Sequence, residues 1–183
     1  MARWFFEAGH TAAQFTVRHM MVTDVRGHFK NIHGTLDYDP RDPRAASATA
    51  TINAREIWTG DQDRDAHLRS ADFLDVERHP EINFASTKVE LLSDNEGILT
   101  GNLTIRGITR EVSLGVRFLG TWETPWWEGN KDRGPKTRAG FVAETSLNRH
   151  DFGASWNSAL DKGGIVVGNT VKIIIDAEAI LED

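Results

Sequence analysis

Arg64, His67 and Asp72 form the group of residues in this sequence best suited to chemistry. A histidine beside a carboxylate can move protons near neutral pH, and an arginine can hold an anionic substrate. An enzyme built on these residues would require the three side chains to converge beside an open cavity. A small-molecule enzyme is therefore one hypothesis, and ion pairing of Arg64 and Arg69 with nearby aspartates is the ordinary alternative. The nearby aspartates are Asp61, Asp65 and Asp72.

Metal ligation has weaker support in the sequence. Asp61, Asp63 and Asp65 have the spacing of the first ligands in a calcium-binding loop, but Ala66 stands where the loop needs a glycine. The seven histidines are scattered, so we expect no metal site. Hydrolase and phosphate-loop motifs are absent as well.

Composition narrows the class of protein. The 183 residues, 39% of them hydrophobic, suit one domain over 1–183. A net charge of -6 argues against nucleic acid as a partner, and the lack of cysteine excludes disulfides and thiolate chemistry. No apolar run is long enough to cross a membrane, and the first residues do not form a signal peptide. We expect a cytoplasmic protein without an integral membrane segment, or a periplasmic one if a leader has been removed.

Alternation of apolar and polar residues predicts strands along most of the chain. In the last segment, Val171, Ile173 and Ile175 share one face, whereas Lys172 and Asp176 share the other. The same pattern predicts seven further strands, over 15–19, 25–36 with a bend at Gly34, 46–53, 81–92, 97–105, 109–122 and 136–148. The stretch 123–135 is expected to be the least ordered.

The predicted strands specify an all-β fold. Asp61–Ser70 interrupts the alternation as a short helical insertion between the third and fourth strands. Eight antiparallel strands can close into a barrel, although a β-sandwich is the alternative. Small residues on the faces assigned inward favour a cavity over a filled core. They are Gly27, Ala48, Ala50, Gly107, Ala143, Ala177 and Ala179.

Five segments in one order resemble the YceI-like family. They are Phe15–Val22, Val25–Phe29, Arg64–Phe73, Gly101–Thr109 and Asn148–Gly153, and the resemblance spans roughly Trp4 to Ala179. It implies a bacterial, lipocalin-like, eight-stranded antiparallel barrel whose channel binds a polyisoprenoid, an isoprenoid quinone, a polyprenyl phosphate or a related amphiphile. It implies a carrier or store of lipid, with no catalysis and no catalytic cofactor.

Inward-facing residues are the candidates for contact with the lipid tail, although ordinary core packing explains each of them equally well. The candidates are Phe15, Val17, His19, Phe29, Ala50, Ile52, Phe84, Leu103, Ile105, Val112, Leu114, Val116, Phe141, Ile173 and Ile175.

A polar headgroup needs hydrogen-bond donors at the mouth of the channel. The candidates within the family-like segments are His19, Arg64, His67, Arg106 and Arg149, because a guanidinium can present a planar fork to a phosphate. Structural ion pairs, and an interior histidine at position 19, are the more ordinary interpretation.

Trp122, Trp126 and Trp127 stand close together in a predicted loop. Indole rings suit surfaces that are half wet, so the loop is a candidate for transient membrane contact or for a homodimer interface. Capping of the barrel is the ordinary alternative, and a scaffold for protein interaction is the alternative function.

Overall fold

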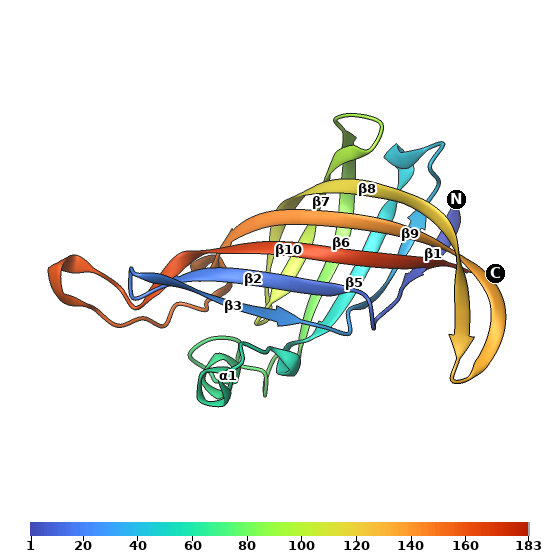
Figure 1. The fold of residues 1–183 in the computed structure, drawn as a ribbon. Coiled ribbons are helices and arrows are strands. Elements are labelled where there is room, and N and C mark those ends of the chain that lie inside the picture. The colour runs from blue at the N-terminus through green and yellow to red at the C-terminus, as the bar shows by residue number, and fades with distance from the viewer. Residues whose placement is uncertain (183) are drawn as a thin grey trace.

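The computed structural model describes residues 1–182, which form one antiparallel sheet of ten strands and one α-helix (Figure 1). The helix is α1 (Gln62–Arg69). The strands are β1 (Ala2–Phe6), β2 (Ala12–His19), β3 (Thr23–Phe29), β4 (His33–Tyr38), β5 (Ser47–Asn53), β6 (Glu81–Leu91), β7 (Glu96–Ile105), β8 (Ile108–Glu128), β9 (Lys131–Asn148) and β10 (Val167–Leu181).

The sheet closes into a barrel with eight strand positions. Its order is β1-β4-β5-β6-β7-β8-β9-β10-β2-β3, and β1 also pairs with β10. One end of β10 pairs with β1, at Phe5 and Ile180, while the rest pairs with β2. Thus β1 and β2 together occupy one position in the wall, and β4 and β3 occupy the next. The predicted eight-stranded antiparallel barrel is confirmed, with two positions each divided between two short strands.

Two details of the predicted strands are wrong. The second strand was expected to continue to Leu36 through a bend at Gly34, but the break falls before β4, where Asn31 has φ of 55°. Gly34 instead lies within β4, where an added Cβ would overlap the Thr49 carbonyl oxygen of β5. The strand β1 was not expected, because its residues show no clean alternation.

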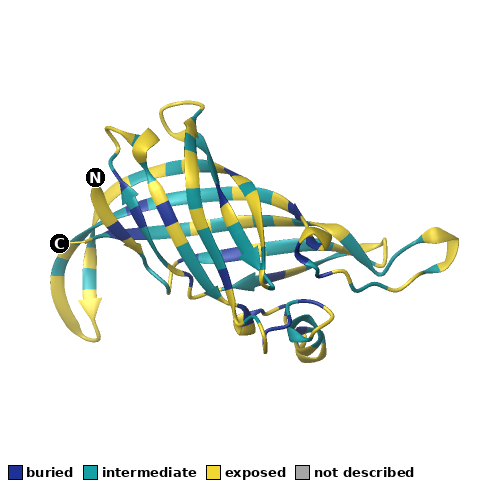
Figure 2. Ribbon diagram, turned by 180° about the vertical axis from the view of Figure 1, so that it is seen from behind, coloured by how far each residue is buried: buried dark blue, intermediate teal, exposed yellow. Residues whose placement is uncertain are grey.

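The stretch 123–135 was expected to be the least ordered, whereas it belongs to a β-hairpin. Pairing between β8 and β9 continues to Glu128 and Lys131, so both strands extend beyond the ends of the other strands (Figure 1). The exposed residues of this hairpin are visible in Figure 2. Trp122 and Trp127 are 58% and 57% exposed there. The tryptophans therefore lie on strands that project from the barrel.

The helical insertion begins as predicted. The Asp61 carboxylate caps α1 by accepting a hydrogen bond from the Arg64 backbone amide at 3.0 Å. Downstream of the helix, Leu74 and Val76 pack with Ala54, Ile82 and Phe29. The insertion thereby covers one end of the barrel with apolar side chains. No helix in the described part of the chain is long and apolar enough to cross a membrane.

Candidate functional site

A cavity of about 280 Å³ lies inside the barrel. Its lining reaches from Glu96, at the start of β7, to Ile105, at the end of the same strand. Ten strand residues span about 30 Å at 3.3 Å each, so the cavity follows most of the length of the wall. The insertion that contains α1 covers the Ile105 end.

Period-2 alternation brings the apolar side chains of several strands to this cavity. Most predicted tail-contact residues line it, and contact with a ligand remains a prediction for all of them. Those lining the cavity are Phe15, Phe29, Ala50, Ile52, Phe84, Leu103, Ile105, Val112, Leu114, Val116, Phe141, Ile173 and Ile175. Val17 and His19 lie further along β2 and are not among the lining residues.

Small side chains leave space in the interior, as the sequence predicts. Ala48, Ala50, Ala143 and Ala177 all line the cavity. Their methyl groups fill little volume between the larger side chains, which is why the interior is hollow rather than packed.

The other small residues predicted to face inward have different roles. Gly27 is buried, and an added Cβ would overlap the Phe15 ring. Ala179 is fully buried and packs with Trp4 and Ala139 rather than against the cavity. Gly107 was wrongly assigned to an inward face, because it lies in the turn between β7 and β8 with φ of 72°.

An aromatic group at the cavity joins the predicted Phe141 to two residues that the sequence interpretation missed, Tyr38 and Phe118. Tyr38, Phe118 and Phe141 are packed with ring centroids 5.3 to 5.4 Å apart. Burial raises the pKa of the Tyr38 phenol, so this side chain adds no charge to the apolar part of the lining. Alternation along β8 places Phe118 on the face of Val116, so Phe118 could have been found; Tyr38 lies in β4, whose limits were misjudged.

The end of the cavity opposite the α1 insertion, called the mouth below, has exposed lining residues and is polar and acidic. Its exposed lining residues are Ser47, Asp94, Asn95 and Glu96, from the β6–β7 turn and the start of β5. The Asn95 carbonyl accepts a 2.8 Å hydrogen bond from the Phe118 amide, which fixes the turn against β8. Two carboxylates, Asp94 and Glu96, therefore stand at the mouth.

The connection between β4 and β5, at the same end, also carries charge. The Arg41 guanidinium bonds to the Asp39 carboxylate at 2.7 and 3.0 Å and lowers the pKa of that carboxyl to about 2. The pair is therefore ionised at every physiological pH. Because Arg41 is already paired, its charge does little to offset the carboxylates at the mouth.

The predicted headgroup residues lie elsewhere. None of His19, Arg64, His67, Arg106 and Arg149 lines the cavity. Arg106 follows the end of β7 opposite the mouth and donates a 2.8 Å hydrogen bond to the Phe73 carbonyl. Arg149 follows β9 at that same end of the barrel.

Arg149 is a buried cation that binds backbone. Its guanidinium donates hydrogen bonds to the carbonyls of Ala154, Trp156, Val167 and Gly168. The residue is only 6% exposed, and burial lowers its pKa from the usual arginine value. Its Nε, Nη1 and Nη2 atoms all donate to main-chain oxygens, so the side chain fastens the segment after β9 to the start of β10.

The expected ion pairs around α1 are wrong. The Arg64 side chain donates to the hydroxyl and carbonyl of Thr59 at 2.8 and 3.0 Å. Arg69 likewise donates to the carbonyls of Arg55 and Ile57. The Thr59 hydroxyl and backbone carbonyls, rather than aspartates, accept the hydrogen bonds of the two arginine side chains.

The residues of the enzyme hypothesis do not converge on a cavity. His67 Nε2 lies 2.8 Å from an Asp72 oxygen, whereas Arg64 is bonded to Thr59. None of the three lines the apolar cavity or the polar hollow beside α1. The arrangement lacks the open cavity that the hypothesis required.

Comparison with known proteins agrees with this architecture. The model of the YceI-like domain matches residues 4–179. The protein YceI of Salmonella newport is 36% identical over 174 residues, which cover 95% of this chain and 83% of that protein.

Two solved structures share the fold. Burkholderia cenocepacia BcnA superposes with a TM-score of 0.76 at 20% identity, covering 94% of this chain and 98% of BcnA. A polyisoprenoid-binding domain from Saccharophagus degradans superposes with a TM-score of 0.68 at 11% identity and covers all of both chains. At these identities the structures establish the shared fold.

Proposed function

Because the chain belongs to the YceI-like domain family, we propose that its barrel binds one long-chain lipid, a polyisoprenoid or an isoprenoid quinone, with the tail inside the cavity. The observation that supports this proposal is the apolar lining that follows β7 from Glu96 to Ile105. A solved neighbour with the same fold is described as polyisoprenoid-binding. The proposed role is to sequester or carry the lipid, not to transform it.

The hydrophobic effect is large enough for tight binding. Burial of one CH₂ group contributes about 0.8 kcal/mol, so one isoprene unit contributes on the order of 3 kcal/mol. A few buried units would suffice for micromolar or better affinity after the cost of ordering the chain. A longer tail would then leave part of itself outside the barrel.

The mouth favours an uncharged headgroup. Asp94 and Glu96 are exposed at the open end and would repel a phosphate, whereas the basic candidates Arg106 and Arg149 lie at the opposite end. A quinone carries no charge and can accept hydrogen bonds from groups such as the Asn95 amide. We therefore propose an isoprenoid quinone in preference to a polyprenyl phosphate.

The first test is to identify what the protein carries. Organic extraction of natively purified protein, followed by mass spectrometry, should release a quinone or another polyprenyl lipid in about equimolar amount. Delipidated protein should then take up an added isoprenoid quinone more tightly than a polyprenyl phosphate of equal tail length. Failure to take up either lipid would contradict the proposal, and a preference for the phosphate would overturn the choice of headgroup.

The β8–β9 hairpin supports a second proposal, namely contact with the membrane that supplies the lipid. Phe118 lies beside the mouth, and the hairpin continues past it to the exposed indoles of Trp122 and Trp127. Indole rings are favoured at the boundary between headgroups and acyl chains. The hairpin would thus place the mouth near a bilayer.

Removal of both indoles, as Trp122→Ala with Trp127→Ala, should slow loading of quinone from vesicles several-fold. Uptake of the same quinone from detergent solution should stay unchanged, because the cavity is intact. Equal loading from vesicles would contradict the membrane proposal. Loss of self-association on size exclusion, without any change in loading, would assign the hairpin to a homodimer interface.

A further inference from the structure

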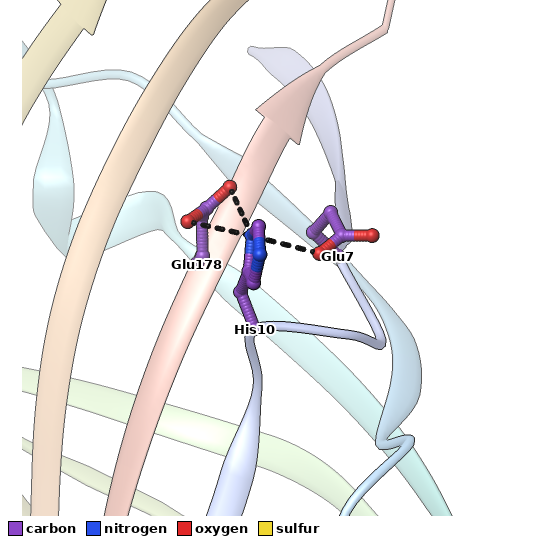
Figure 3. A group of neighbouring side chains, drawn as sticks. All are labelled: Glu7, His10 and Glu178. Carbon is purple, nitrogen blue, oxygen red and sulfur yellow. Dashed lines mark hydrogen bonds and ion pairs between the residues drawn. The ribbon is translucent and has the colours of Figure 1, made fainter. Parts of the chain in front are cut away.

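Glu7, His10 and Glu178 converge on the outer side of the wall, where the chain passes from β1 to β2 (Figure 3). His10 Nδ1 lies 3.0 Å from Glu7 Oε2 and 3.3 Å from each carboxylate oxygen of Glu178. One donor atom from each residue lies within 4.8 Å of the other two. The group is separate from the interior cavity, since none of the three residues lines it.

Backbone hydrogen bonds hold the turn that carries these side chains. The Glu7 amide donates to the Glu178 carbonyl at 2.9 Å, and the His10 amide donates to the Glu7 carbonyl at 3.0 Å. The Thr11 hydroxyl, on a residue only 2% exposed, bonds to both the carbonyl and the amide of Glu178 at 3.2 Å. The three side chains therefore project from a rigid and preorganised frame.

The geometry points to a binding site for a divalent transition-metal ion, which we propose to be Zn²⁺ or an ion of similar chemistry. Two ligands at about 2.1 Å from a tetrahedral ion lie about 3.4 Å apart, close to the separations between His10 and the two carboxylates. One imidazole nitrogen with carboxylate oxygens suits Zn²⁺, Ni²⁺ or Cu²⁺ better than Ca²⁺ or Mg²⁺. Water would complete the coordination.

A proton on His10 cannot form hydrogen bonds to all of the carboxylate oxygens around it. Nδ1 carries at most one proton, yet it faces three carboxylate oxygens at 3.0 to 3.3 Å. Glu7 Oε2 is buried and accepts no well-aligned hydrogen bond among the described residues. A dication in place of the proton could bond to His10 and to both carboxylates at once.

Arg138 provides the balancing charge beside this group. Its Nε atom lies 2.5 Å from Glu178 Oε1, in an ion pair without hydrogen-bond alignment, which leaves Oε2 for a metal. Carboxylates that bind metals usually have partners in the outer shell, and Arg138 is close enough to Glu178 to be one. With two carboxylates and one guanidinium, the site keeps one net negative charge to attract a dication.

The site could not be found from sequence, and no metal site was expected. His10 and Glu178 are 168 positions apart, and only the pairing of β10 with the strands on either side of the turn brings them together. A bound ion would join the β1–β2 turn to β10. It would thus cross-link the chain at the position where the barrel closes.

Calorimetric titration of the untagged full chain with Zn²⁺ tests the proposal. We expect one saturable site, and His10→Ala should weaken binding about tenfold or more, since even outer-shell losses at metal sites cost about 10- to 100-fold. Glu178→Gln should act in the same direction. His150→Ala is the matched control, and it should leave binding unchanged. His150 is exposed just after β9, whose Asn148 pairs with Thr170, eight positions along β10 from Glu178.

Three results would overturn the assignment. The first is the lack of saturable Zn²⁺ binding below about 1 mM, a dissociation constant that corresponds to a binding free energy of only about 4 kcal/mol. The second is equal binding of Zn²⁺ by wild type and His10→Ala. The third is binding of Ca²⁺ as tight as that of Zn²⁺. Circular dichroism of each variant tests whether it is folded. If Glu178→Gln does not fold, Glu7→Gln is a second variant that removes a carboxylate ligand. Intense Co²⁺ absorption in the visible range would give independent evidence for a tetrahedral site.

Discussion

Ala143→Trp should reduce the affinity for lipid by about 100-fold. Ala143 lines the cavity on β9, between Val116 and Ile175 of the neighbouring strands, and both of these residues also line it. An enclosed Trp buries about 150–250 Å², so the indole would occupy space needed by the tail. Displacement of roughly one isoprene unit costs on the order of 3 kcal/mol, which corresponds to the stated loss. Fluorescence titration with an isoprenoid quinone measures the effect.

Glu144→Trp is the control for this variant. Glu144 is the next residue on β9 and is exposed on the outer face, so its replacement adds the same indole without filling the cavity. We expect this variant to bind lipid like the wild type. Undiminished binding by folded Ala143→Trp, and by the second filling variant Ala50→Phe, would show that the tail does not occupy the interior.

Arg149→Met should lower the free energy of unfolding by about 3–5 kcal/mol. Methionine keeps much of the aliphatic volume but removes the donors that satisfy four carbonyls, and each hydrogen bond to a charged group is worth about 1.5–3 kcal/mol before non-additivity. The buried oxygens left without partners account for the loss. Urea unfolding followed by circular dichroism gives the difference.

Arg117→Met provides the comparison, because Arg117 is exposed on β8. It should change stability by less than about 0.5 kcal/mol. Arg149→Lys should remain strongly destabilised, because one ammonium cannot reproduce the fork of the guanidinium. A loss below about 1 kcal/mol in Arg149→Met would show that water replaces the missing donors.

The wall of the cavity was predictable because alternation assigns faces without knowledge of the partner strand. In β10, the faces of Ile173 and Ile175 follow from period 2 alone, and both residues line the cavity. The limits of β1 and β4 were not predictable, because both strands are defined by pairing with distant segments. β1 does not alternate clearly, and the alternation of Leu36 and Tyr38 in β4 does not show where that strand begins.

The roles of the basic residues and the acidic character of the mouth were not predictable, for a different reason. Arginine has a long side chain with five donors, and sequence does not reveal whether they face a ligand or a neighbouring carbonyl. Arg64 and Arg149 both bind local backbone oxygens. The acidic mouth depends on which end of the barrel stays open, and packing of the segment after α1 decides this.

The pairing of β1 with β10 has a consequence for how the protein is made. Trp4 pairs with Leu181, so closure joins residues from opposite ends of the chain. Contacts of such long sequence separation carry the largest loop-closure entropy and form late in folding. Of the strands in this barrel, β1 leaves the ribosome first, yet its partner β10 is synthesised after all the others. The nascent chain must therefore keep an unfinished sheet edge from aggregating until β10 has emerged.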